Sequence, residues 1–313
     1  MFQSKHFKYL LFLILFTITM DVAIGNLYEA LYLSEKSRNS DRLIHSVLET
    51  NEDILIFGSS RASHHYIPKI IEDSLSMSCF NVGFDGKNIF FHLLLLKETI
   101  KRYRPKIIIL DLILKDFVST NKYSDIDQMN TFTPFYNYAD SITAYFLKNM
   151  KYARYKNISF LYKYNSKIHF VFANNMNLAR MHQNGFVPLS RTWKGEIKRA
   201  DTGQLKAVTN FDSEKIKAIE CFISTCIENG TELYVSFSPT FVLYPDENEY
   251  HILGEYLYNN YRVNIFNYHN NSTYINNPDL FADPSHLNSS GAKVFTLQLI
   301  TDIKAHSINN NDR

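Results

Sequence analysis

The chain has 313 residues, enough to bury a sizeable core in one large domain or two small ones. Hydrophobic residues make up 45% of the sequence and charged residues 20%, which excludes an intrinsically disordered chain. The formal net charge of +2 gives no strongly basic field, so a nucleic-acid partner is not expected.

The first 25 residues predict a membrane anchor. Their beginning, MFQSKHFK, is basic, and an apolar run from Tyr9 to Met20 follows it. This run is short for a membrane-spanning helix, but with Asp21 near the interface it extends through residues 22–24 and can cross a thinned bilayer. The basic flank predicts that the rest of the chain lies outside the cytoplasm, on the periplasmic or extracellular face.

Two other interpretations of this segment remain open. Ala23 and Gly25 place small residues at the recognition positions of a signal peptidase, so the chain could be secreted after cleavage. The segment could also be a buried core helix of a cytoplasmic protein. A helix-compatible pattern continues through residues 26–50 and favours an uncleaved anchor that is followed by a helical linker.

Five short apolar segments alternate with helical patterns in the remainder. This alternation predicts a three-layer α/β/α sandwich around a doubly wound, flavodoxin-like, parallel five-stranded sheet. We expect one such domain at residues 51–308, with an irregular insertion at about 117–210. The expected strands are 53–57, 79–82, 106–112, 232–237 and 263–266, and the main expected helices are 68–77, 88–104, 212–229, 246–261 and 289–305.

Polar residues follow the first expected strand at its carboxyl end, where doubly wound sheets bind ligands. The sequence there is GSSRASHH, residues 58–65, and it opens a short helix. A serine at this place is either a helix N-cap or a nucleophile that needs a base oriented by a third group. The adjacent His64 and His65 point in different directions on a helix, so they are not expected to bind a metal together, and we interpret them as bystanders.

A second cluster of reactive residues precedes the last expected helix, in FADPSHLNSSGA at residues 281–292. Asp283 and His286 are three residues apart, so one loop can present both side chains. The carboxylate would then fix the tautomer of the imidazole and stabilise its charged form. The three cysteines follow no metal-ligand pattern, and we predict no metal and no cofactor.

The set GSS, NVGFDG and DPSHLNSSGA resembles the SGNH, or GDSL-type, hydrolase superfamily. It is most similar to bacterial, membrane-anchored envelope members whose first block reads GSSR. The resemblance covers roughly residues 50–116 and 210–305, together with NGFVP in the middle region. It implies a Ser–His–Asp triad of Ser60, His286 and Asp283.

The same resemblance implies an oxyanion hole. It assigns the N–H of Ser60 and a glycine of NVGFDG, namely Gly86 or alternatively Gly83. The family's third block supplies an asparagine donor, but Lys115 stands at that position in this chain. A missing oxyanion donor lowers the rate about 10²–10³-fold, so Lys115 either replaces the donor or leaves a slower site.

The resemblance implies an exported serine esterase or acyltransferase that acts on acyl esters, chiefly O-acetyl esters, of an envelope or extracellular glycan. The alternative is an inactive SGNH-like domain that binds glycan or polysaccharide-modifying partners. Weaker candidates for substrate contact are Arg61 and, in the middle region, Arg191 and Trp193.

Overall fold

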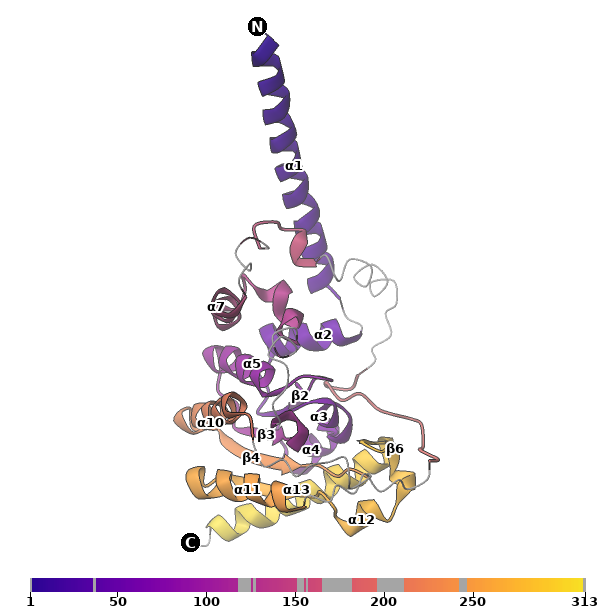
Figure 1. Cartoon of the computed structure of the whole chain (residues 1–313). Helices are drawn as coiled ribbons and strands as arrows, with labels where there is room; N and C mark the ends of the chain where they lie inside the picture. Colours follow the sequence, from indigo (N-terminus) through magenta and orange to yellow (C-terminus); the bar gives the residue numbers. More distant parts are fainter. Residues whose placement is uncertain are drawn as a thin grey trace. The chain divides into compact units, whose positions relative to one another are not determined.

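The computed structural model in Figure 1 describes most of the chain. The described residues are 2–35, 38–117, 125, 128–150, 155, 157–164, 182–195, 211–241 and 247–311. The chain divides into two compact units. Met1–Val47 and Met129–Met181 form what we call the N-terminal unit, and Leu48–Gln128 and His182–Arg313 form the α/β unit. The irregular middle region is therefore shared: its central part, Met129–Met181, groups with the N-terminal helix, and the residues before and after that part belong to the α/β unit.

The α/β unit is built on the expected five-stranded sheet. All neighbouring strands are parallel, in the order β2-β1-β3-β4-β5. The central pair is in register from Ile54 opposite Ile107 to Phe57 opposite Leu110. The strands are β1 (Ile54–Phe57), β2 (Cys79–Asn81), β3 (Ile107–Asp111), β4 (Glu232–Phe237) and β5 (Asn264–Asn267).

Helices cover both faces of this sheet (Figure 1). Alternate strand residues such as Ile54 and Ile109 pack on one face with Phe295 of the last helix, α13 (Ser289–Asn311). On the other face, the ring of Phe57 lies 5.3 Å from that of Phe222 of α10 (Ser213–Glu228). The helices are α3 (Ser60–His65), α4 (Pro68–Leu75), α5 (Ile89–Arg102), α10 (Ser213–Glu228), α11 (Glu247–Tyr261), α12 (Ser272–Ile275) and α13 (Ser289–Asn311), with short 3₁₀ turns η2 (Leu114–Phe117) and η5 (Pro278–Leu280). The prediction of an α/β fold is confirmed.

A small hairpin replaces the loop that we expected before the last helix. The strands β6 (Phe281–Asp283) and β7 (His286–Leu287) are antiparallel, with an irregularity in register between Phe281 and Asp283. The N–H of Phe241, in the loop after β4, donates to the carbonyl of Pro284 at the tip of the hairpin. The hairpin is therefore fastened to the carboxyl side of the sheet.

The N-terminal unit is organised around one long helix, α1 (Phe2–Leu33), which continues through the expected boundary at residues 25 and 26. Its part Lys5–Leu33 is long and apolar enough to cross a membrane, as a signal sequence also is. Tyr32 of α1 is buried against the rings of Phe135 and Tyr164. The other elements are α2 (Arg38–Ile44), η1 (His45–Glu49), η3 (Asn130–Phe135), α7 (Asp140–Asn149) and η4 (Tyr162–Tyr164). The boundary between the two units along the chain falls within η1, after Val47.

Candidate active site

The nucleophile candidate stands on a tight turn between β1 and α3. Gly58 has φ +139°, and a Cβ there would lie 2.6 Å from the carbonyl oxygen of Asp111, so the turn requires glycine. Ser59 occupies the N-cap position of α3 but makes no side-chain capping bond. Helix capping therefore does not explain the pair of serines, and Ser60 is left at the first helical position.

The structure brings Ser60, His286 and Asp283 together although the serine is 226 residues from the histidine. The Nε2 atom of His286 lies 2.7 Å from Ser60 Oγ, and its Nδ1 atom lies 2.8 Å from Asp283 Oδ1. A carboxylate can only accept a hydrogen bond, so Nδ1 carries the ring proton when the imidazole is neutral. Nε2 is then an acceptor, and the hydroxyl of Ser60 donates to it.

The carboxylate of Asp283 is held from three directions. Its Oδ1 atom also accepts the main-chain N–H groups of Ser285 (3.0 Å) and His286 (3.1 Å), and Oδ2 lies 2.6 Å from Nη2 of Arg191. Partial burial raises the pKa of Asp283, but the N–H of Ser285, the charge of His286 and Arg191 outweigh it and hold the pKa below its usual value. The group is therefore ionised at neutral pH.

The structure describes the main chain of all the oxyanion-hole candidates but not the side chain of Lys115. The N–H of Ser60 is in the first turn of α3, where a helix offers unpaired donors. Gly86 is exposed, with φ +68°, and among the described residues nothing accepts its N–H. The N–H of the alternative, Gly83, donates to Asn81 Oδ1 at 3.0 Å, which favours Gly86. The main chain of Lys115 lies in η2, but its side chain is outside the described part of the structure.

The rings of both histidines of α3 pack against that of His286. The interpretation of them as bystanders did not predict this contact. The ring of His64 packs edge-on at 5.5 Å from that of His286, and its nitrogens contact Asp85 Oδ2 (3.2 Å) and the carbonyl of Val187 (2.7 Å). His64 is four residues after Ser60 and therefore on the same face of the helix. This spacing in the sequence could have predicted that His64 lies near Ser60.

His65 holds the main chain beside the base. Its Nε2 atom accepts the N–H of Leu287 at 3.0 Å, so the proton of its neutral ring is on Nδ1. Burial, together with the neighbouring charges of His286 and Arg61, lowers the pKa of His65 well below its usual value. A neutral His65 therefore keeps its acceptor for β7 at neutral pH.

Residues 182–195 form a strap that fastens the elements of the site to one another. Along the strap, the carbonyl of Asn184 accepts from β2, the N–H of Val187 donates to Ser63 of α3, and the carbonyl of Leu189 accepts from Ser289 of α13. Arg191 then reaches Asp283. The NGFVP stretch, residues 184–188, lies in this strap, but its sequence does not predict these contacts.

Trp193 lies at the end of the strap. Its main-chain N–H donates to the carbonyl of Phe281 at 2.8 Å, and the centre of its indole ring lies 4.8 Å from that of the Phe241 ring. Trp193 is half-buried against the core, and this packing favours a role in holding β6 over one in substrate binding.

Arg61, the residue after Ser60, is buried. Its guanidinium donates to the carbonyls of Leu112 (2.8 Å) and Ser238 (3.1 Å), which follow β3 and β4, and Nε lies 3.8 Å from Asp111 Oδ2. The hydroxyl of Tyr66 donates to the other oxygen of Asp111 at 2.7 Å. With 2% of its surface exposed, Arg61 holds strand ends together, so the geometry favours a structural role over the substrate contact suggested by the sequence.

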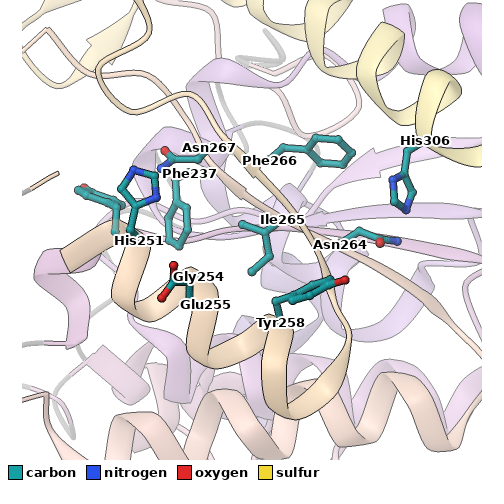
Figure 2. A pocket seen from close by; sticks show the side chains of 11 residues that line it. Phe237, His251, Gly254, Glu255, Tyr258, Asn264, Ile265, Phe266, Asn267 and His306 are labelled. Carbon is teal, nitrogen blue, oxygen red and sulfur yellow. The ribbon is translucent and has the colours of Figure 1, made fainter. Parts of the chain in front are cut away.

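A separate pocket of about 380 Å³ lies along the edge strand β5. Figure 2 shows it between β5 and α11, with Tyr258 and Glu255 on the helix and His306 of α13 at one side. None of the triad residues lines this pocket.

No protein-family model matches this chain, and no curated protein matches it either.

Proposed function

We propose that the chain is a membrane-anchored serine hydrolase of the SGNH type that cleaves or transfers the acyl group of carboxylic esters. The observation that carries the proposal is the continuous contact from Ser60 Oγ through His286 to Asp283, with distances of 2.7 and 2.8 Å. A base within hydrogen-bonding reach of a hydroxyl, itself oriented by a carboxylate, is the arrangement that activates serine. The strand order β2-β1-β3-β4-β5 supports a flavodoxin-like arrangement of the sheet.

The reaction follows from these positions. Ser60 Oγ attacks the carbonyl carbon of the ester while its proton moves to His286 Nε2, and Asp283 stabilises the resulting imidazolium. The negative charge on the carbonyl oxygen is stabilised by the N–H groups of Ser60 and Gly86. When the tetrahedral species collapses, the bond to the leaving oxygen breaks, and that oxygen takes the proton from Nε2. The acyl group is then bonded to Ser60.

The second half of the reaction releases the acyl group. A water molecule or a sugar hydroxyl gives its proton to His286 Nε2 and attacks the acyl carbon, and Ser60 leaves and regains a proton. Water completes an esterase reaction, whereas a sugar hydroxyl completes an acyltransferase reaction. The resemblance to envelope enzymes and the apolar helix α1 support an O-acetylated glycan outside the cytoplasm as substrate, and polysaccharide-modifying proteins as partners.

Release of p-nitrophenol from p-nitrophenyl acetate tests the proposal. Ser60→Ala removes the nucleophile and should abolish turnover. Ser59→Ala is the matched control, because Ser59 is adjacent but makes no capping bond, and it should retain activity. Equal activity in the unaltered chain and the Ser60→Ala variant would overturn the proposal. A chain with no activity on any acyl ester and no reactive serine would instead support the inactive, glycan-binding alternative.

A further inference from the structure

The helix α1 changes its surroundings at Asp21. All side chains from Lys5 to Met20 are exposed, whereas Gly25, Tyr28 and Tyr32 are buried within the N-terminal unit. The bare apolar run Tyr9–Met20 spans only about 18 Å at a rise of 1.5 Å per residue. A bilayer core of about 30 Å needs about 20 residues, so a crossing that begins at Tyr9 extends past Asp21 to the neighbourhood of Tyr28.

Such a crossing places the carboxylate of Asp21 in or close to the apolar layer, where an unpaired charge is costly. The structure supplies partners for both of its oxygens. Oδ1 accepts the hydroxyl of Ser159 (2.5 Å) and the N–H of Leu161 (3.3 Å), and Oδ2 accepts the N–H of Phe160 (2.8 Å). These bonds fasten residues 159–161 to the helix at the level of Asp21.

Gly25 makes the approach of this segment possible. It lies one helical turn after Asp21, on the same face of α1. A Cβ at Gly25 would lie 2.4 Å from the Cβ of Phe160, so the segment packs directly on the helix backbone. The position of residues 159–161 along α1 is therefore fixed by two independent contacts. One is the set of hydrogen bonds to Asp21, and the other is the packing of Phe160 on the backbone of α1 at Gly25.

Four apolar side chains in and near this segment are exposed. We call the four side chains the Asp21 patch: Tyr155 and Ile158 are each 72% exposed, Tyr162 is 44% exposed and Phe160 is 37% exposed. Clustered exposed apolar side chains mark interaction surfaces, and tyrosine is enriched where a membrane meets water. Phe160 of this patch contacts α1 at Asp21 and Gly25, in the part of the helix that the length argument places in or close to the bilayer.

We propose that the Asp21 patch inserts into the interfacial layer of a lipid bilayer beside α1. The inference rests on the membrane anchoring that is part of the proposed function. The N-terminal unit then holds the membrane with two elements, a crossing helix and a short flanking segment. Asp21 does not end the membrane-embedded region, because the flanking segment satisfies its carboxylate there.

Depth-dependent fluorescence quenching tests the inference. The full chain is reconstituted in phosphatidylcholine vesicles that carry bromine atoms either near the headgroup or near the end of one acyl chain. Tryptophan is introduced by Ile158→Trp, or by Tyr162→Trp as a second position, and the emission of the native Trp193 is measured on the unaltered chain and subtracted. Phe12→Trp, at a 67% exposed position of α1, reports on the anchor, and Ile227→Trp, at a 54% exposed position of α10, is the control for non-specific lipid contact.

We expect blue-shifted emission from Ile158→Trp, with the strongest loss caused by bromines near the headgroup. Phe12→Trp should lose most emission to bromines near the chain ends, and Ile227→Trp should lose little to either. Quenching at position 12 without quenching at 158 and 162 would overturn the inference and leave the anchor intact. Equal quenching at 158 and 227 would also overturn it. No quenching at position 12 would overturn the anchor and the inference together.

Discussion

The described residues of the α/β unit include two aspartate–arginine pairs, which differ in their access to water. Asp111 and Arg61 have side chains that are 0% and 3% exposed, at the ends of the sheet strands. Asp283 and Arg191 have side chains that are 25% and 67% exposed, on the hairpin and the strap. The first pair therefore links strand ends, and the second holds the carboxylate that contacts His286.

The surroundings of the two carboxylates explain the difference. Burial raises the pKa of Asp111, while Arg61, Tyr66 and Ser238 oppose this effect. Asp283 has main-chain donors and the imidazole of His286 as a partner, and its pKa is lowered. A change in the buried pair should therefore affect mainly the free energy of unfolding, and a change in the exposed pair should affect mainly the rate.

The largest expected effect is the loss of activity when Asp283, of the more exposed pair, is changed. Asp283→Asn should lower kcat about 10⁴-fold, because an amide does not select the tautomer that leaves Nε2 as an acceptor. The exposed Asp279, four residues earlier, offers the matched control: Asp279→Asn should retain kcat. Steady-state hydrolysis of p-nitrophenyl acetate measures both. Full activity in Asp283→Asn would show that Asp283 does not orient the base.

Arg61→Leu should destabilise the α/β unit by about 3–5 kcal/mol, because it leaves the carboxylate of Asp111 buried without its charged partner. Tyr66→Phe should cost less, about 1–3 kcal/mol, by removing one hydrogen bond to the same carboxylate. Urea unfolding followed by the emission of Trp193, the single tryptophan, reports on this unit. An Arg61→Leu variant as stable as the unaltered chain would contradict a structural role for Arg61.

The buried histidines predict sensitivity to acid. Burial lowers the pKa of His92 and His269 to about 3, and that of His65 well below its usual value. Unfolded histidine takes up a proton below about pH 6.5, whereas these folded ones stay neutral, so stability falls as the pH falls from about 6.5 toward 3. His92 and His269 each contribute a loss of about 1.4 kcal/mol per pH unit in this window.

His92→Phe tests this prediction away from the site. The ring of His92 packs edge-on against Phe57 and Phe91, so phenylalanine suits the position. Urea midpoints of the variant should depend less steeply on pH between about 6 and 4.5, by the equivalent of one proton. An unchanged slope would mean that His92 titrates alike in the folded and unfolded chain.

The smallest effect is expected for Arg191→Ala. The pair with Asp283 is largely exposed, and two main-chain N–H groups still hold the carboxylate, so stability should fall by about 0.2–1 kcal/mol and kcat/KM at most about fivefold. Arg191→Lys should recover part of the rate. A loss of rate as large as that expected for Asp283→Asn would place Arg191 in direct contact with the reacting groups. It would contradict the interpretation that Arg191 only holds the carboxylate of Asp283.

Much of the fold could be predicted from the sequence because the sheet is buried on both faces. The stretches around Ile54–Phe57 and Ile107–Asp111 are continuous apolar runs between helical patterns, and the strands lie within a residue or so of the expected bounds. The division of the middle region could not be predicted. Met129–Met181 joins the N-terminal unit through tertiary packing, which leaves no local pattern.

The site shows the same limit. Motif spacing led to Ser60, Asp283 and His286, which the structure brings together. The burial of Arg61 and the contact of Arg191 with Asp283 depend on chain segments far apart in sequence, so the two arginines could not be told apart beforehand. The position of His64 could have been predicted, because it lies four residues after Ser60 and therefore on the same face of the helix. Its adjacency to His65 drew attention to a metal-binding pair instead.

Covalent labelling of Ser60 tests the central claim most directly. The full chain is incubated with a fluorophosphonate, and the modified peptide is identified by mass spectrometry, in parallel with His286→Ala and Ser59→Ala. We predict a single phosphonate adduct on Ser60, retained in Ser59→Ala and lost or strongly slowed in His286→Ala. No adduct on Ser60, or an adduct that forms equally fast without His286, would contradict a serine activated by this triad.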